Sequence, residues 1–528
     1  LVAGLGIRKV RYPVLWETAQ RGSGDDFDFT WAAKRLRRLR ELGIEPIAGL
    51  LHHGSGPSTT SLVDPQFPEK LARYARAVAE TFPELRDYTP VNEPLTTARF
   101  SGLYGVWYPH GKDNCTFLRA LVNECRGTVL AMREIRAVNP EARLIQTDDL
   151  GRAAATTPCQ AQARFENERR WLAFDLLFGH VGNSHPLWDW VLANGVEQHE
   201  LEWFLENTCA PDIVGINHYP LSNRFLDHRI GLYPERFHCF REAEPYADLG
   251  VPQAREYLCA DPLRPRFVLP EEILREVCAR YTCPVAVTEV HIDGPRERQI
   301  QWLNEVWRAA VRVRDQGGNV CAVTVWSLLG SFDWNSLCSI CDMYYEPGVF
   351  DIRGSEPRPT AIADVARALA TEGSCEHPLA IRPGWWHEER AAASGPQLLI
   401  IGQGRLGQAF ARVAQQRGLD YQLLTRKEVD IASLEQVRHA LRMTRPFAVV
   451  NAAGFARVNA AEVNREQAFR DNAEGGEILA SECEKHGLPL LAFSSHLVFN
   501  GDKAGTMSPY LEHDEPHPLN VYGLTKTE

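Results

Sequence analysis

The sequence lacks several features that would place it in a specialised class of protein. Its 528 residues contain no run of about 18 apolar residues, so no segment is expected to cross a membrane. The formal charge is −11, from 57 basic and 68 acidic residues, which disfavours nucleic acid or an anionic membrane as a main partner. With 44% hydrophobic and 24% charged residues, the chain has the composition of an ordinary folded protein.

The cysteines and the first residues give no sign of secretion. The 13 cysteines are an odd number without a disulfide framework, which favours reduced thiols in the cytoplasm. No basic segment followed by an apolar stretch and a small-residue cleavage site opens the chain, so no signal peptide is visible. Cys338 and Cys341 form one CxxC pair, and without a second pair we expect ordinary thiols and no metal site.

The first 370 residues alternate short β-branched runs with amphipathic helical stretches, a pattern typical of βα units around a parallel sheet. Seven strands are predicted, within residues 7–16, 44–53, 88–94, 142–150, 212–220, 284–291 and 322–330. A closed barrel of this kind needs eight. Residues 1–16 repeat the layout of residues 39–53, so we expect Leu1 near the end of a helix whose preceding strand is not in this sequence.

A second domain is expected after a connector. The periodicity stops between residues 371 and 396, in a polar stretch with Pro and Gly where Trp385 and Trp386 are expected to dock on a domain face. The predicted fold class is therefore α/β throughout. A (β/α)8 barrel without its first strand at 1–370 is joined by a linker, 371–396, to a Rossmann-type doubly wound parallel sheet at 397–528.

Two glutamates end predicted strands of the barrel. Glu93 follows the run YTPVN, and Glu289 follows VAVT. In a barrel the carboxyl ends of all strands meet on one face, so the two carboxyls would face a common cleft. Glycosidic cleavage needs such a pair, one to protonate the leaving oxygen and one to attack or to activate water. Taken alone, a strand-end glutamate is more often a solvated or helix-capping residue.

The order of several motifs adds to this interpretation. From about residue 5 to 370 the chain resembles the family 1 glycoside hydrolases, in the segments IEPIAGLLHH, YTPVNEP, DIVGINHYP, VTEVHIDG and VWSLLGSFDWNS. The resemblance implies a retaining mechanism, with Glu93 as acid/base, Glu289 as nucleophile and carboxyls roughly 5 Å apart. Glu93 would then need a raised pKa, whereas Glu289 must stay ionised. No cofactor is expected for the barrel.

The same resemblance implies a set of sugar-binding residues. They are His52, Asn92, Asn217, Tyr219, Trp326, Asp333 and Trp334. Asn92 would contact the 2-hydroxyl, and Tyr219 would hold the nucleophile. Two departures from the family pattern are visible: Val290 and His291 follow the nucleophile, and Asp333 replaces a glutamate that grips two sugar hydroxyls. They leave open another sugar, glycosyl transfer in place of hydrolysis, or sugar binding without turnover.

The second domain opens with a glycine-rich turn between an apolar strand and a helix. The turn, GQGRLG, contains Gly402, Gly404, Arg405, Leu406 and Gly407. Such glycines let backbone N–H groups approach a pyrophosphate at a helix N-terminus. The next strand ends at Arg426, where an acidic residue would select NAD, so an arginine that pairs with a 2′-phosphate favours NADP over NAD. Arg426 could equally be a solvated surface residue.

The end of the chain carries a Tyr-x-x-x-Lys motif. Tyr522 and Lys526 are one helical turn apart, so the lysine would lower the phenol pKa from about 10 and let the tyrosine pass a proton to a carbonyl. Ser495 lies at a strand end between the Gly-rich turn and this motif.

From Gln397 to Glu528 the chain resembles the extended short-chain dehydrogenase/reductases, most closely the dTDP-4-dehydrorhamnose reductases. The resemblance implies catalytic roles for Ser495, Tyr522 and Lys526, and a cofactor-lining strand end at Asn451, Ala452 and Ala453. His496 departs from the usual Asp, and the likeness stops at Glu528, before most of the sugar-nucleotide lobe. Glycosides or nucleotide sugars are the expected partners, and a non-catalytic binding domain is the alternative.

Overall fold

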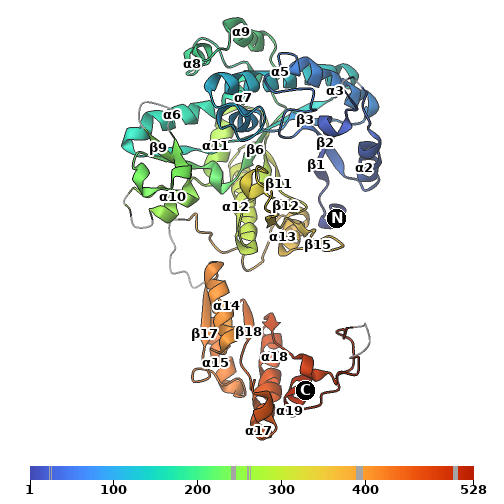
Figure 1. Ribbon diagram of the computed structural model, residues 1–528, viewed down its shortest axis with the longest axis vertical. Helices are drawn as coiled ribbons and strands as arrows, with labels where there is room; N and C mark the ends of the chain where they lie inside the picture. Colours follow the sequence, from blue (N-terminus) through green and yellow to red (C-terminus); the bar gives the residue numbers. More distant parts are fainter. Residues whose placement is uncertain are drawn as a thin grey trace. The chain divides into compact units, whose positions relative to one another are not determined.

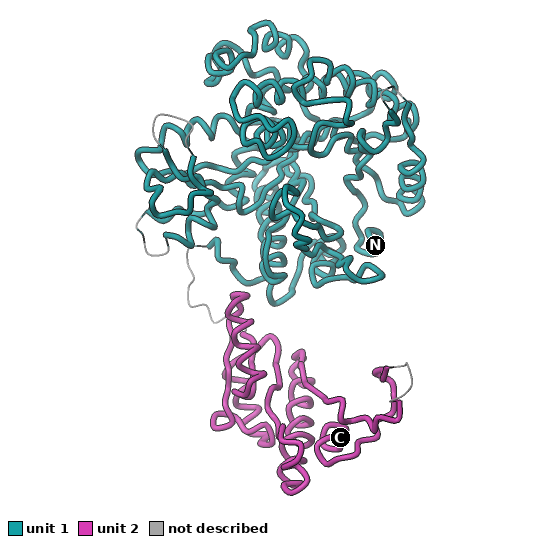
Figure 2. Tube along the Cα trace, in the orientation of Figure 1, with its two compact units in different colours: residues 1–389 teal, residues 390–528 magenta. Residues whose placement is uncertain are grey.

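A computed structural model describes residues 1–22, 24, 26–239, 245–258, 261, 263–387, 397–503 and 509–528. The chain divides into two compact units, Leu1–Glu389 and Arg390–Glu528 (Figure 2). Among the residues described, no helix is both long and apolar enough to span a membrane.

Unit 1 is built on a seven-stranded parallel sheet (Figure 1). In sheet order the strands are β1 Lys9–Pro13, β2 Glu45–Leu51, β3 Asp87–Val91, β4 Arg143–Asp149, β6 Ile213–His218, β10 Val285–Val290 and β11 Val320–Val325. Five lie within predicted segments, while β3 begins one residue and β11 two residues before the segments predicted for them, and the seven together confirm the α/β fold class. In the described part of the chain, the edge strands β1 and β11 each pair with one neighbour, so the sheet does not close.

Helices follow most of these strands and cover the sheet. They are α1 Trp16–Ala19, α2 Thr30–Glu41, α3 Phe67–Thr81, α4 Pro94–Ala98, α5 Asn114–Val138, α6 Gln160–Arg169, α7 Leu172–Phe178, α8 Trp188–Ala193, α9 Gln198–Glu206, α10 Val251–Tyr257, α11 Pro270–Arg280, α12 Arg296–Asp315 and α13 Ala361–Glu372. In α3 the apolar residues Leu71, Ala75 and Val78 recur every three to four positions and are fully buried. This face packs against α5.

The start of the chain agrees with the repeat seen in its sequence. Residues Ala3–Leu5 form a short 3-10 helix that precedes β1 and packs against α13. Gly6 ends this helix with a left-handed φ of 72°, a conformation that glycine adopts without steric cost.

A small second sheet of unit 1 was not anticipated from the sequence. Its strand order is β5 Ala153–Ala155, β7 Arg224–Asp227, β9 Tyr246–Gly250 and β8 His238–Cys239. Two two-stranded pairings also occur among the described residues, β12 Ser331–Phe332 with β13 Tyr345–Glu346 and β14 Phe350–Asp351 with β15 Arg358–Pro359. Strands of two to five residues carry too little alternation to be recognised from a sequence.

Residues after α13 remain packed on unit 1. The Trp386 ring lies 5.0 Å from that of Trp302, and the Trp385 ring lies 5.2 Å from that of Phe267. Asn304 Nδ2 donates to the Ala380 carbonyl at 2.7 Å. The expected docking of the two tryptophans is therefore confirmed, and contacts of unit 1 continue past the boundary predicted at 370. Residues 388–396 of the predicted linker lie outside the described residues.

Unit 2 has a four-stranded parallel sheet of the Rossmann type, as predicted. The strand order is β17 Tyr421–Leu424, β16 Leu398–Ile401, β18 Ala448–Asn451 and β19 Leu490–Leu491. Its helices are α14 Arg405–Gln416, α15 Leu434–Thr444, α16 Val458–Ala461, α17 Arg465–Phe469, α18 Gly475–Lys485 and α19 Val521–Thr527. The chain turns one way from β16 to β17 and the other way to β18, so the crevice beyond the ends of β16 and β18 is the place where such sheets bind ligands.

Trp386 gives a test of the docked segment. Because its side chain is 1% exposed, Trp386→Ala should leave a cavity and lower the free energy of unfolding of unit 1 by about 3 kcal/mol or more. Trp31→Ala removes a tryptophan that is 68% exposed and should cost far less. Hydrogen exchange of unit 1 in the full chain measures both. Equal protection in the two variants would contradict the packing.

Candidate functional site

Glu93 sits at the turn between β3 and α4. Its backbone is left-handed, with φ 49°, and its N–H donates to the Thr147 carbonyl at 3.1 Å. The side chain is buried, and Oε1 accepts a hydrogen bond from Asn217 Nδ2 of β6 at 2.6 Å. His53 Nε2, from the end of β2, lies 3.9 Å from Oε2.

Glu289 lies on β10 and has a different set of partners. Tyr219 donates its hydroxyl to Oε2, and the Arg11 guanidinium of β1 contacts Oε1. Sequence reasoning missed Arg11. The available signal was a basic residue in the middle of a predicted barrel strand.

The two carboxyls are therefore close in space but differ electrostatically. Burial, and then the charge of Glu289, raise the pKa of Glu93 well above its usual value, in the direction expected for a proton donor. Burial also raises the pKa of Tyr219, so the phenol remains a hydrogen-bond donor to Glu289. The pKa of His52 and that of His53 are lowered by burial, which favours a neutral imidazole at each, with His53 beside Glu93.

The two asparagines of the predicted site have unequal freedom. Both polar atoms of the Asn217 side chain have hydrogen-bond partners: Nδ2 donates to Glu93, and Oδ1 accepts from Thr288 Oγ1 at 2.7 Å. Asn92 Oδ1 accepts from Thr147 Oγ1 at 2.8 Å and from Arg11. Asn92 Nδ2 is buried without a partner among the described residues, so it remains available to donate to a ligand.

Aromatic rings surround the carboxyl pair. Trp326 lies 6.2 Å from Tyr219 and 6.0 Å from Trp334, measured between ring centroids. Trp334 in turn lies 5.8 Å from His53, whose ring is 4.5 Å from that of His52. Rings in this arrangement suit the C–H faces of a sugar, and nearby fixed polar groups suit its hydroxyls.

Asp333 is committed to its own loop. Its Oδ1 accepts from the Tyr344 N–H at 2.8 Å and from the Asp342 N–H at 3.2 Å. A separate pair missed by sequence reasoning lies near Trp326, where His291 Nε2 is 3.0 Å from Glu346 Oε2.

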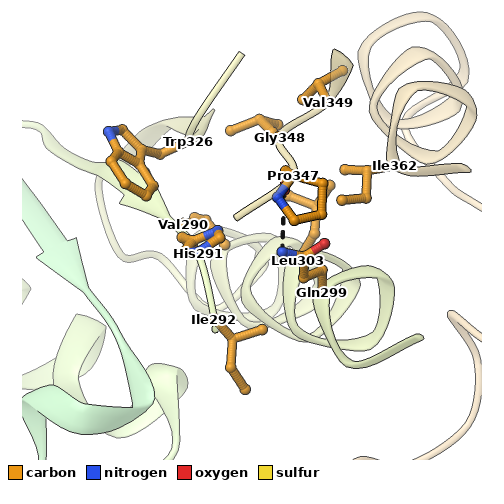
Figure 3. Close-up of a pocket in the computed structure, with 11 residues that line it drawn as sticks. Val290, His291, Ile292, Gln299, Leu303, Trp326, Pro347, Gly348, Val349 and Ile362 are labelled. Atoms are coloured by element: carbon orange, nitrogen blue, oxygen red, sulfur yellow. Dashed lines mark hydrogen bonds between the residues drawn. The ribbon is translucent and has the colours of Figure 1, made fainter. Parts of the chain in front are cut away.

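Figure 3 shows a small pocket behind Trp326 and His291, between the end of β10 and helices α12 and α13. Gln299 Nε2 donates across it to the Pro347 carbonyl at 3.3 Å. Glu93 and Glu289 do not line this pocket, which shares Trp326 with the site predicted from the sequence.

The Gly-rich turn of unit 2 has the geometry of a phosphate cradle. A Cβ at Gly402, whose φ is 109°, would lie 2.6 Å from the Ala452 carbonyl, and one at Gly407 would meet the Gly402 carbonyl oxygen. Gly404 faces open space at the N-terminus of α14, where no side chain caps the helix. The exposed residues Arg405 and Leu406 follow it. The residues present therefore fit a dinucleotide pyrophosphate.

Arg426 is anchored beside the end of β17. Its guanidinium makes two bonds to the buried carboxylate of Asp471, at 2.7 and 2.9 Å, while the arginine side chain stays 59% exposed. Asn451 Oδ1 accepts from the Ala453 N–H at 3.1 Å and shapes the end of β18.

Tyr522 and Lys526 lie on α19, one turn apart as predicted. Burial lowers the pKa of Lys526, whose Nζ would be 3.6 Å from a Cβ at Gly454, just beyond β18. Asn472, missed by sequence reasoning, ties this loop to α19 through the Phe455 backbone and Thr525 Oγ1.

Ser495 precedes a short 3-10 helix that packs against α19, and its Oγ accepts from the Leu497 N–H at 3.2 Å. The structure thus places Ser495 on an element next to the Tyr522 helix.

Comparison with known proteins supports the sequence resemblance in unit 2. Residues 396–528 match the family described as the RmlD substrate binding domain. The chain is 34% identical over 135 residues to a dTDP-4-dehydrorhamnose reductase of Aggregatibacter actinomycetemcomitans, and 36% identical over 132 residues to one of Streptomyces griseus. These matches cover 25% of this chain and 45% and 42% of the two relatives, so the chain spans less than half of their length.

Solved structures resemble the chain over a larger share. A β-glucosidase of Thermotoga maritima in complex with azafagomine superposes with a TM-score of 0.57 and 18% identity, over 71% of this chain and 85% of that chain. The same enzyme in complex with deoxynojirimycin superposes with a TM-score of 0.58. At this identity the likeness establishes the fold, that of the family 1 β-glucosidases.

The Gly-rich turn yields a paired test. Gly402→Ala should destabilise unit 2 by about 1–3 kcal/mol, because the new Cβ meets the Ala452 backbone and the residue has a left-handed φ. Gly404→Ala, which enters open space, should change stability by about 0.5 kcal/mol or less. Thermal unfolding of unit 2, monitored by hydrogen exchange, compares the two variants. Equal losses of stability would count against the described turn.

Proposed function

We propose that unit 1 is a retaining glycosidase that cleaves O-glycosidic bonds, with Glu93 as acid/base and Glu289 as nucleophile. One observation carries the proposal: two buried carboxyls at the ends of β3 and β10 have opposite surroundings. Glu93 is buried, faces other acids and has a raised pKa, whereas Glu289 is paired with the Arg11 cation and the Tyr219 hydroxyl. A protonated donor opposite an ionised nucleophile is what a retaining mechanism requires.

The steps follow from these partners. Glu93 gives its proton to the leaving oxygen as the C1–O bond breaks, and a Glu289 oxygen forms an ester bond to C1. Water then loses a proton to Glu93, attacks C1 and releases Glu289 as a carboxylate, so that both groups return to their starting state. Asn92 Nδ2, which is unpaired among the described residues, donates to a sugar hydroxyl.

Unit 2 is proposed to be an NADP-dependent reductase domain for a nucleotide-linked 4-keto sugar. When bound, the dinucleotide supplies a hydride. The amide of Gly404 at the start of α14 would hold its pyrophosphate, and Arg426 its 2′-phosphate. Tyr522 would give a proton to the carbonyl oxygen, with the Lys526 ammonium one helical turn away on α19. The named relatives of this unit, dTDP-4-dehydrorhamnose reductases, support the substrate class.

A sugar-binding protein without turnover is the second candidate for unit 1. The state of Asp333 favours it, because one carboxylate oxygen is held by backbone N–H groups and is not free to grip a sugar. Glycosyl transfer to an acceptor other than water is a variant of the first proposal, since it uses the same two glutamates.

Trapping the nucleophile distinguishes these functions. The full chain is incubated with 2-fluoro glycosides that carry activated leaving groups, and adducts are mapped by peptide mass spectrometry. We expect a glycosyl adduct on Glu289 that Glu289→Gln abolishes. Glu93→Gln should still form it, because an activated leaving group needs no proton.

No adduct from any sugar, with folded protein, would favour the binding function. Faster decay of the adduct with an added acceptor sugar than with water alone would indicate transfer.

Arg426 tests the choice of dinucleotide. Loss of a charge-assisted bond to a 2′-phosphate costs about 1.5–3 kcal/mol, so Arg426→Ala should weaken NADPH binding about tenfold or more and leave NADH binding unchanged. Arg438→Ala, which removes an arginine paired with Glu482, is the matched control. Calorimetric titration of the full chain measures both. A parallel loss for the two dinucleotides would refute the role of Arg426.

A further inference from the structure

Asp148 holds the first turn of the helix that follows Glu93. It is fully buried near the end of β4, and its Oδ2 accepts from the Leu95 N–H at 2.8 Å. Its Oδ1 accepts from Thr96 twice, from the N–H at 3.3 Å and from Oγ1 at 3.1 Å. These N–H groups open α4 directly after Pro94, and a helix leaves such groups without partners of its own.

The residue that normally satisfies these groups is the one before the helix. Here that residue is Glu93, and α4 has no bond from its side chain. The Glu93 carboxyl instead extends to Asn217 on another strand. A carboxylate from β4 thus takes over the capping of α4, and the Glu93 side chain is left for the site.

The backbone of Glu93 needs support of this kind. A left-handed φ in a glutamate persists only where the surroundings hold it. Consecutive residues of β4 hold both sides of this turn. Thr147 accepts from the Glu93 N–H, and Asp148 accepts from the two N–H groups beyond Pro94.

We propose that Asp148 is a positioning residue for Glu93: by capping α4 in place of Glu93, it fixes the left-handed turn and directs the Glu93 carboxyl into the site. The proposal rests on the acid/base function proposed above for Glu93. Asp148 itself does not touch the substrate.

Asp148 also acts on Glu93 through its charge. The groups that face Glu93 are His53 from the end of β2, Asn217 of β6, Glu289 of β10, and Asp148 and Asp149 of β4. Behind Asp148 lie Glu124 of α5, whose carboxyl has no hydrogen-bond partner among the described residues, and the Arg99 guanidinium.

Burial raises the pKa of Asp148 to about 7, so Asp148 is ionised at alkaline pH. Its charge, after burial and Glu289, raises the pKa of Glu93. Removal of that charge should therefore let Glu93 lose its proton at lower pH. Because the acid form is the active donor, the alkaline limb of kcat/KM should move to lower pH in Asp148→Asn.

The test compares leaving groups. Two aryl glycosides of the same sugar are prepared, one with an activated leaving group and one with a poor leaving group. Only the poor leaving group needs a proton from Glu93 when it departs. In Asp148→Ala we expect kcat/KM to fall at least tenfold for the poor leaving group and less than threefold for the activated one. Asp113→Ala, which removes the ordinary cap of α5 at the Thr116 N–H, should change neither.

A second measurement does not depend on turnover. The carboxyl carbon of Glu93, assigned with Glu93→Gln, is titrated by NMR in the full-length wild-type chain and in Asp148→Asn. We expect a lower titration midpoint in the variant, and this variant also serves if Asp148→Ala fails to fold.

The outcomes separate the two proposals. An equal loss on both substrates with an unchanged midpoint would overturn the role of Asp148 and leave the glycosidase proposal standing. A wild-type chain that turns over no glycoside would overturn the proposed function, and an unchanged Glu93 midpoint would then refute the link to Asp148 independently.

Discussion

The site in unit 1 depends on the register of its parallel strands. Asn92 bridges to Thr147 beyond β3, Asp149 lies opposite Asn217, and Asn217 lies opposite Glu289. Polar residues from four strands are thus placed at one level, near the carboxyl ends where chemistry is built in such sheets. A slip of one residue would turn each of these side chains to the other face of the sheet. Backbone pairing, more than any one side-chain contact, brings Glu93 and Glu289 together.

Burial of two carboxyls at one place is costly unless each is compensated. The protein compensates them differently. Glu289 is matched by the positive charge of Arg11, whereas Glu93 is placed where its neutral form is favoured. A single cation for two acids creates the asymmetry on which proton donation and nucleophilic attack depend. Asp148 extends the same arrangement to a third buried acid, whose charge opposes ionisation of Glu93 and whose oxygens hold the next helix.

In unit 2 the proposed binding site is shaped mainly by the backbone. Its glycines bring the turn after β16 against the end of β18 and leave open space at the N-terminus of α14. Asn472 joins the loop after β18 to α19, which places Lys526 beside that loop. In both units a turn proposed for binding or chemistry lies just beyond a parallel strand, at Glu93 after β3 and at Gly402 after β16, because there the backbone is free to turn while the sheet supports it.

The sequence by itself determined the seven strands of unit 1, the Rossmann-type sheet of unit 2, and the two strand-end glutamates, because these follow from local periodicity and short motifs. It gave no account of Arg11, Glu346 or Asp148, whose partners lie 278, 55 and 52 to 53 residues away. Nor did it indicate that Asn217 hydrogen-bonds through both its amide nitrogen and its amide oxygen, or that Asp333 accepts hydrogen bonds from its own loop. Only the tertiary structure decided these points, because they depend on strand register and side-chain direction, which no local pattern of residues specifies.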